Sequence, residues 1–198
     1  SPAAMNADPV RILDELVRFR TDRVHGDERK LAEHLGHRMD VVQSNISVSS
    51  RGTVRGIHFA DVPPSQAKYI TVLSGSIIDF IVDIRVGSPT FGQWESVVLD
   101  TSERKAVYLA EGLGHAFCAL EEDSTAMYLC SAPYTPLREH GINPLDTTVG
   151  LTLPDDIEPL LSPKDEAAPS LAEAEALIEE GVPVAPLPLP VVPPEACN

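Results

Sequence analysis

The 198-residue chain contains no apolar run long enough to cross a membrane as a helix, so we expect no membrane-spanning segment. Its first residues lack the basic start and apolar block of a signal peptide, and we expect no secretory leader. Three cysteines, Cys118, Cys130 and Cys197, show neither metal-binding nor redox spacing. Because a sparse, odd set of cysteines is typical of a reducing compartment, we expect a cytoplasmic protein.

Signatures of several catalytic classes are also missing. The sequence has no G-x-G-x-x-G fingerprint, no P-loop and no G-x-S-x-G elbow, which argues against dinucleotide, ATP and common hydrolase sites. No H-x-H pair occurs, although a two-histidine, one-carboxylate metal site in a β-barrel needs one. We therefore expect neither a metal nor an organic cofactor.

Positive charge is scarce. Lys and Arg number 15 against 30 Asp and Glu, which gives a net charge of −15. Surfaces that bind nucleic acid or anionic membranes need clustered positive charge, so neither partner is expected. An anionic ligand would need a local cationic cluster, and Arg51, Arg55 and Lys68 are close enough in sequence to form one.

The sequence does contain many short β-favouring segments. They are separated by Gly and Pro at roughly ten-residue spacing, which predicts an antiparallel sandwich or barrel. The expected strands cover residues 54–59, 68–73, 76–84, 94–99, 106–109, 115–120 and 125–130. This β-rich core, residues 41–153, follows a charged segment, residues 1–40, in which residues 10–17 and 27–35 favour short helices.

The last zone, residues 154–198, has a different character. Ser170 and Glu173 form a capping box that begins a short helix, and an apolar stripe ends before Gly181. The final stretch is rich in proline and predicts an extended tail that packs on the core or on a partner.

Chemistry is concentrated in the sequence V-R-G-I-H-F and the strand that follows it. Strict alternation along the first strand would turn Arg55 and Phe59 to one face and His58 to the other. Lys68 begins the next strand. A histidine base beside a cation is what proton abstraction next to a carbonyl needs. The alternative is that the two cations are edge-strand charges and the histidine is structural.

Three further residues have both a functional and a structural interpretation. His115 follows a glycine turn at a strand start, where functional polar groups are common, but a half-buried structural histidine would look the same. Tyr128 alternates with apolar residues, and a lone tyrosine in such a pattern is most often part of the core. Asp165 reads on its own as a loop charge. The segment 76–84 also carries two aspartates, Asp79 and Asp83, at inward or interfacial positions.

Taken together, these motifs resemble a known family. V-R-G-I-H-F, Q-A-K, D-I-R-x-G-S-P-T-F-G-x-W, G-x-x-H-A-F and L-S-x-K-D occur in order over residues 43–165. They resemble the dTDP-4-dehydro-6-deoxyglucose 3,5-epimerases, the RmlC-like sugar-nucleotide epimerases. The resemblance implies an all-β, cupin-type antiparallel jelly roll, a homodimer, and a TDP-linked 4-keto-6-deoxyhexose as substrate without a cofactor.

The resemblance also implies roles for five residues. His58 would be the general base and Asp165 its orienting partner. Lys68 would stabilise the C4 enolate oxygen, Tyr128 would return a proton from the opposite face, and His115 would line the sugar pocket. The chemistry is consistent, since a C4 ketone acidifies the hydrogens at C3 and C5, and inversion needs a base and an acid on opposite sides of the ring.

For the nucleotide, the resemblance implies that Arg55 and Tyr134 contact the diphosphate and that Gln43 lies near the base. The chain departs from the family pattern at three places: His25 stands where an arginine is expected, Phe59-Ala60 replaces a usual Tyr-Gln, and Pro133 replaces the first tyrosine of a usual pair. We expect selectivity for one carbon, with C5 slightly favoured.

The sequence therefore predicts an isomerase of deoxysugar biosynthesis, serving a natural product. Two alternatives remain open. One is a non-catalytic cupin that binds a sugar nucleotide, and the other is a ketoisomerase acting on the same class of substrate.

Overall fold

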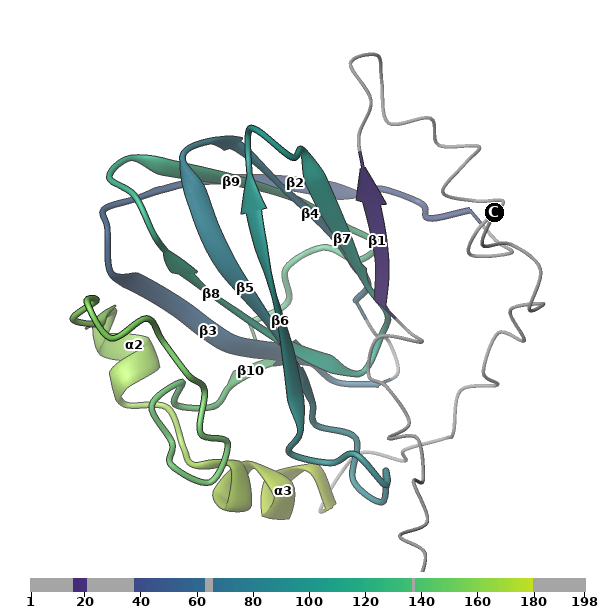
Figure 1. Cartoon of the computed structure of the whole chain (residues 1–198). Coiled ribbons are helices and arrows are strands. Elements are labelled where there is room, and N and C mark those ends of the chain that lie inside the picture. Colours follow the sequence, from purple (N-terminus) through teal and green to yellow (C-terminus); the bar gives the residue numbers. More distant parts are fainter. Residues whose placement is uncertain (1–15, 21–37, 63–65, 137, 180–198) are drawn as a thin grey trace, which may run out of the picture.

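A computed structural model describes residues 16–20, 38–62, 66–136 and 138–179 (Figure 1). Two sheets of mainly antiparallel strands face each other and form the predicted jelly roll. Sheet A has the order β1 (Leu16–Arg20), β7 (Lys105–Leu109), β4 (Lys68–Ser74), β9 (Ser124–Cys130) and β2 (Gln43–Ser49). Sheet B has the order β10 (Glu139–Gly141), β3 (Thr53–Ala60), β8 (Leu113–Ala119), β5 (Ser76–Asp83) and β6 (Trp94–Asp100).

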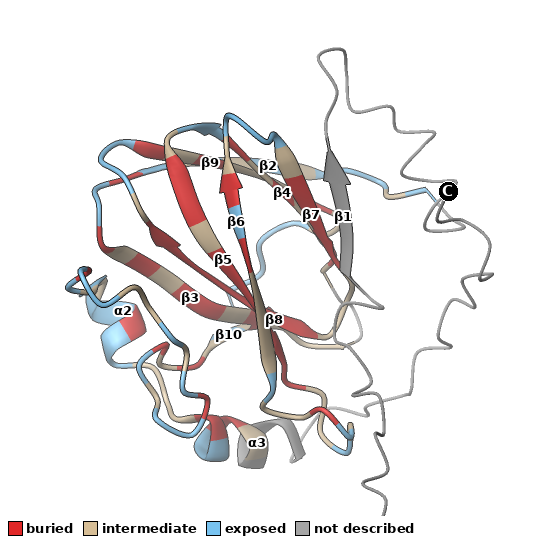
Figure 2. Cartoon of the chain, in the orientation of Figure 1, coloured by how far each residue is buried: buried red, intermediate tan, exposed pale blue. Residues whose placement is uncertain are grey.

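Alternating apolar side chains place one hydrophobic cluster between the sheets. Ile70 and Val72 from sheet A meet Ile77, Ile81 and their neighbours from sheet B, and nearly all of these side chains are buried (Figure 2). Residues at odd positions of β5 and β8 therefore face inward, and those at even positions of β4 and β9 do the same. The space between these inner faces is called the barrel interior below.

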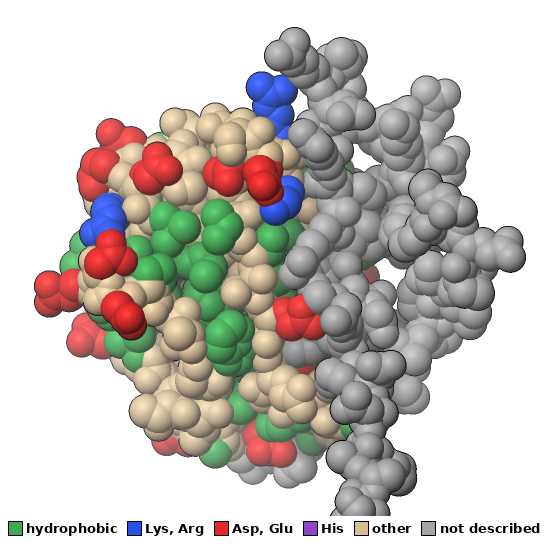
Figure 3. Space-filling view, in the orientation of Figure 1, with side chains coloured by type: hydrophobic (Ala, Val, Ile, Leu, Met, Phe, Trp, Pro, Cys, Tyr) green, Lys and Arg blue, Asp and Glu red, His purple; other side chains and the backbone are tan. Residues whose placement is uncertain are grey.

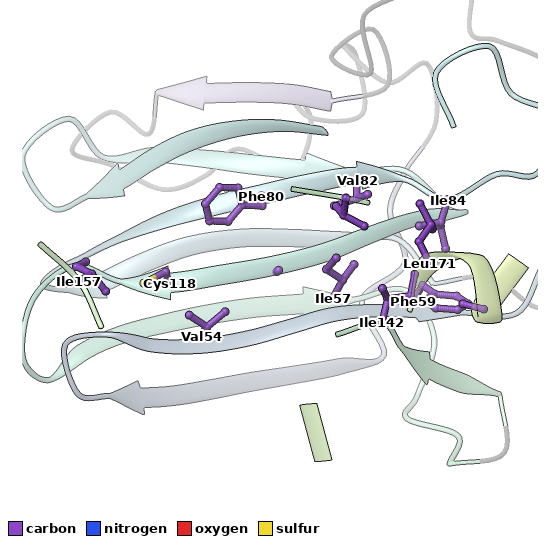
Figure 4. Close-up of a cluster of buried hydrophobic side chains, with 13 residues drawn as sticks. Val54, Ile57, Phe59, Phe80, Val82, Ile84, Cys118, Ile142, Ile157 and Leu171 are labelled. Atoms are coloured by element: carbon purple, nitrogen blue, oxygen red, sulfur yellow. The ribbon is translucent and has the colours of Figure 1, made fainter. Parts of the chain in front are cut away.

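A second cluster covers the outer face of sheet B. Val54, Ile57 and Phe80 point outward from their strands and pack against the chain that follows β10. Leu171 contributes from α3 (Leu171–Glu179), next to the end of the sheet (Figure 4). The indole N–H of Trp94 also donates to the carbonyl oxygen of Val149 at 3.1 Å, which ties this segment to β6.

The predicted C-terminal helix is confirmed as α3, together with its capping box. The Ser170 N–H donates to Oε2 of Glu173 at 2.8 Å, and the Glu173 N–H donates to Oγ of Ser170 at 3.3 Å. In the apolar stripe, Leu171 and Ala174 are buried. The proline-rich tail lies outside the described residues.

The N-terminal helix prediction is wrong where the structure tests it. Leu16 and Val17 belong to β1, which pairs antiparallel with β7 and sets Leu16 opposite Leu109. The edge of β7 offers backbone partners to this segment, and such tertiary pairing overrides a weak local helix preference. Residues 10–15 and 27–35 lie outside the described part of the chain.

The motif D-I-R-x-G-S-P-T folds around one buried carboxylate. Oδ2 of Asp83 accepts hydrogen bonds from Arg85 at 2.8 Å, from Oγ of Ser88 at 2.6 Å and from Oγ1 of Thr90 at 2.5 Å. Burial alone would raise the pKa of Asp83, but these hydrogen bonds outweigh it and lower the pKa to about 2. The motif is thus explained by the turn that it stabilises between β5 and β6.

Candidate active site

A bulge in β3 decides where the base candidate points. Arg55 pairs with Phe117 and His58 pairs with His115, so two residues of β3 lie opposite one residue of β8. Phe117 belongs to the inner cluster, and the bulge therefore turns both Arg55 and His58 to the barrel interior. The expectation that strict alternation separates these two side chains was wrong, because it assumed an unbroken ladder.

Gly56 is what permits the bulge. Its φ is +117°, a conformation that residues with a side chain rarely adopt. A Cβ added there would lie 2.4 Å from the carbonyl oxygen of His115 and 2.7 Å from Cα of Ala116. The adjacent residue, Ile57, is fully buried in the outer cluster and anchors the bulge from the other side.

His58 is paired with Asp165, although 107 positions separate them in the chain. His58 Nε2 lies 2.7 Å from Oδ1 of Asp165, and the two side chains are 34% and 6% exposed. The strand β11 (Leu160–Leu161) runs parallel to the start of β3, and α2 (Pro163–Glu166) follows it directly. The carboxylate therefore reaches His58 at the edge of β3 that β10 and β11 share.

Asp165 is held as a carboxylate. Burial would raise its pKa, but hydrogen bonds from His58, from the Ser162 hydroxyl at 3.0 Å and from the Gly56 N–H lower the pKa below its usual value. Ser162 also caps α2, accepting from the Asp165 N–H at 3.1 Å. A carboxylate at Nε2 fixes the histidine proton on that nitrogen and leaves Nδ1 free to act as a base.

Lys68 and Tyr128 are on the inner face of the other sheet. Lys68 pairs with Cys130, and Ile70 pairs with Tyr128, so the lysine and the tyrosine lie diagonally on neighbouring strands of the inner face. Burial raises the pKa of Tyr128, and Cys130 adds to this effect. The phenol therefore keeps its proton at neutral pH and can donate it.

His115 is also paired with a carboxylate, Asp79. His115 Nε2 lies 2.6 Å from Oδ1 of Asp79, and both side chains are almost wholly buried on neighbouring strands, β8 and β5. The sequence placed Asp79 inward but gave no partner for it. The only signal was a charged residue inside an otherwise apolar strand.

The three nucleotide candidates contact the two ends of β2. The backbone N–H of Tyr134 donates to Oε1 of Gln43 at 2.8 Å, so these two residues are in contact. Arg55 is held separately, with its Nε donating to Oγ of Ser49 at 3.2 Å. Sequence reasoning missed Asn45, which accepts a hydrogen bond from Gln43 at 3.0 Å and alternates with it along β2.

Arg51 does not join the expected cationic cluster. Its guanidinium is paired with Asp156 at 2.6 Å and also donates to the carbonyl oxygen of Leu120. Of the three cations of that cluster, Arg55 and Lys68 are therefore the two on the inner side of the strands. Within the described part of the chain, no three His, Cys, Asp or Glu side chains gather in a way that could hold a metal ion. No described helix is long and apolar enough to span a membrane.

Solved structures with the same architecture are sugar epimerases. ChmJ, a 3'-monoepimerase from Streptomyces bikiniensis in complex with dTDP-quinovose, is 46% identical with a TM-score of 0.77, covering 82% of this chain and 87% of ChmJ. NovW, a 4-keto-6-deoxy sugar epimerase from the novobiocin gene cluster of Streptomyces spheroides, is 46% identical with a TM-score of 0.74, covering 82% and 83%. The fold and the site thus define a cupin-type sugar epimerase.

The sequence comparison identifies the family itself. The family model described as dTDP-4-dehydrorhamnose 3,5-epimerase matches residues 25–173, and the chain belongs to this family. The dTDP-4-dehydrorhamnose 3,5-epimerase of Mycolicibacterium smegmatis is 59% identical over 144 residues, which cover 73% of this chain and 71% of that protein. The dTDP-4-dehydro-6-deoxyglucose 3-epimerase of Streptomyces bikiniensis is 55% identical over 142 residues, 72% of each chain.

Proposed function

We propose that this protein is a cofactor-independent epimerase that inverts C3, C5 or both of a dTDP-linked 4-keto-6-deoxyhexose. The observation that carries the proposal is that the candidate base and the candidate acid are on opposite sheets of the barrel. The His58–Asp165 pair lies on sheet B, while Lys68 and Tyr128 project from the inner face of sheet A. Inversion next to a ketone requires this arrangement, with a base on one side of the ring and an acid on the other.

In the proposed reaction, Nδ1 of His58 removes the proton from the carbon beside the C4 ketone. Asp165 stabilises the imidazolium that forms, because it keeps its negative charge. Lys68 donates to the enolate oxygen at C4. Tyr128 then delivers its proton from the opposite sheet, and the stereocentre is inverted.

The nucleotide is proposed to lie along Gln43, Tyr134 and Arg55, with His115 lining the sugar pocket. The cation of Arg55 supplies a counter-charge for the diphosphate in a chain whose net charge is −15. Acidic side chains lie around the rim of the face shown in Figure 3, and basic ones are few there. A local cation is needed because the negative net charge of the chain would otherwise repel an anionic substrate.

The relatives also bear on the pathway and on the carbon inverted. NovW comes from an antibiotic gene cluster, which supports a role in natural-product deoxysugar biosynthesis. The one-carbon enzymes among the relatives reported above are named for C3. These names give no support to the expected preference for C5. A cytoplasmic location remains a prediction from the cysteine pattern.

A homodimer is proposed from the outer face of sheet A. β2 is an edge strand among the described strands, and its outward side chains Ile46 and Val48 are 65% and 58% exposed. Leu73, on the same face of β4, is 49% exposed. An apolar face beside an open strand edge favours pairing with a second copy.

Hydrogen exchange with solvent tests the function directly. Incubation of a dTDP-4-keto-6-deoxyhexose in deuterated water, followed by proton NMR, should show loss of the H3 signal, the H5 signal or both, together with a new sugar isomer. His58→Asn should slow this exchange by about 10²–10⁴-fold. A protein that bound the sugar nucleotide but exchanged no hydrogen would be the non-catalytic cupin, and movement of the carbonyl without inversion would indicate a ketoisomerase.

Metal independence is the second test. The proposed mechanism uses only side chains of the chain, so dialysis against a strong chelator should leave the exchange rate unchanged within about twofold. A rate that falls on chelation and returns with a divalent ion would contradict the mechanism.

A further inference from the structure

Asp79 is a buried carboxylate with half of its hydrogen-bonding capacity unused. The residue is fully buried on the inner face of β5, between Ile77 and Ile81 of the same face. Oδ1 accepts from His115 at 2.6 Å, whereas Oδ2 has no hydrogen-bond partner in the structure. An ionised carboxylate in such a position is costly unless a positive charge lies within range.

Lys68 is a cation of the opposite sheet that reaches the same interior as Asp79 and is influenced by its charge. It projects from β4 into the same interior, because the next residues on its face, Ile70 and Val72, pack into the cluster between the sheets. Arg55, the other cation that faces inward, is hydrogen-bonded to Oγ of Ser49 and to the backbone of β2. Lys68 is therefore the better counter-charge for Asp79.

Among the titratable groups around Lys68, Asp79 is the most deeply buried one that carries a negative charge. Burial raises the pKa of the Cys130 thiol and the Tyr128 phenol on β9, so both are neutral near pH 7. Glu139 on β10 is only partly buried, and its Oε1 accepts from the Thr135 N–H at 3.2 Å. On sheet B, His58 and His115 each donate to a carboxylate of their own.

We propose that Asp79 is a positioning residue, whose carboxylate, oriented by His115, keeps the ammonium group of Lys68 charged in the barrel interior. The inference rests on the proposed role of Lys68 as the enolate stabiliser, since only a charged amine can serve fully in that role. Burial lowers the pKa of Lys68; Cys130 opposes this shift once its thiol is ionised, and the negative charges of Glu139 and Asp79 oppose it as well. Loss of the Asp79 charge would therefore lower that pKa further, and the ammonium would lose its proton at a lower pH.

Direct titration of Lys68 tests the proposal without substrate. The chain has only four lysines, Lys30, Lys68, Lys105 and Lys164, so ¹³C-labelled lysine side chains give few NMR signals, and Lys68→Arg assigns one of them. Asp79→Asn should lower the pKa of Lys68 by about one unit or more. Glu103→Gln is the matched control, because Glu103 is paired with Lys105 on the surface and its loss should leave Lys68 unaffected. An unchanged Lys68 titration in Asp79→Asn would overturn the proposal.

A double variant keeps the test decisive if Asp79→Asn fails to fold. Removal of one partner of a buried charge pair leaves the other uncompensated, whereas removal of both is much better tolerated. Lys68→Met combined with Asp79→Asn should therefore fold better than Asp79→Asn alone. If the double variant is no more stable than the single one, the two charges are not coupled and the proposal fails.

The pH dependence of turnover separates a charge effect from a structural one. In Asp79→Asn the alkaline limb of the exchange rate should move to lower pH. In a Lys68→Arg background the same substitution should leave the limb in place, because a guanidinium keeps its proton. An equal loss of rate at every pH in both backgrounds would mean that Asp79 only supports the fold. If Lys68 shifts as expected but no variant exchanges sugar hydrogens, the charge coupling stands and the proposed function fails.

Discussion

Asp165 accepts hydrogen bonds from three donors and is almost wholly buried. His58, Ser162 and the Gly56 N–H all donate to it, and their combined effect lowers the pKa of the carboxyl. A residue that only balanced surface charge would not need this environment. The local structure is what a carboxylate requires if it is to stay ionised while a neighbouring histidine gains a proton.

Asp165→Asn tests this interpretation by replacing one carboxylate oxygen with an NH₂ group. The amide keeps the size of the side chain but removes its charge, and it can turn its NH₂ group toward Nε2 and hold the histidine in the wrong tautomer. The exchange rate should fall by about 10²-fold or more, with little change in thermal stability. Glu166→Gln, the next residue of α2, loses an exposed carboxylate and should keep the wild-type rate. Equal rates in both variants would remove Asp165 from the mechanism.

Tyr128→Phe tests whether Tyr128 is the proton donor on the side of the sugar opposite His58. Loss of the phenol leaves His58 and Lys68 able to remove and return a proton on one side only. The variant should keep exchange of the substrate hydrogen with deuterium but lose most of the net inversion. Tyr108→Phe is the control, because Tyr108 is buried outside the inner cluster, against Ala67. Full inversion by Tyr128→Phe would assign the proton donor to another group.

At the scale of elements, β3 is where sequence and structure differ most. The seven predicted core strands are all present, since alternating apolar residues and Gly or Pro breaks record burial on a sheet directly. The bulge between Arg55 and His58 could not be predicted, because it depends on the register with β8, which is set by tertiary pairing. The same is true of Asp79, whose partner is on another strand, and of Leu16, whose strand needs the edge of β7.

The resemblance predicted the pairing of His58 with Asp165, which local residue patterns could not. The structure supplies the physical reason, since β11 runs parallel to β3 and carries α2 to the edge where the histidine lies. A two-residue strand and a four-residue helix are too short to leave a periodic signal in the sequence. Such short elements are therefore found only when the fold is assembled.

Gly56→Ala measures how far the site depends on the bulge. The substitution meets both an unfavourable φ and atoms at 2.4 Å, so it should destabilise the protein by about 2 kcal/mol or more and abolish turnover. Gly87→Ala is the matched control: its φ is +82°, but an added Cβ would meet nothing within 4 Å. Thermal or denaturant unfolding should show a clearly larger loss for Gly56→Ala. Equal losses would mean that the close approach of β3 to β8 contributes nothing.

At the scale of the whole molecule, the outer faces of the two sheets differ in how far their apolar side chains are exposed. Sheet B is covered on its outer side by the chain after β10, including α3, and most apolar side chains of that face are buried. Sheet A keeps exposed apolar side chains on its outer side, at Ile46, Val48 and Leu73. A chain with a net charge of −15 repels copies of itself at long range, so association must rely on a local apolar contact of this kind.

Ile46→Lys should therefore convert the proposed dimer to a monomer. A lysine on this apolar face would have to lose water on association, and burial of its unpaired charge should cost about 3 kcal/mol, or roughly a hundredfold in the dimer dissociation constant. Leu145→Lys makes the same chemical change at an exposed site that is 48% accessible, on the chain after β10, and should leave the dimer intact. Sedimentation velocity over a range of protein concentrations measures both. A wild-type protein that sediments as a monomer throughout would contradict the proposal, and a dimer that survives Ile46→Lys would locate its interface away from β2.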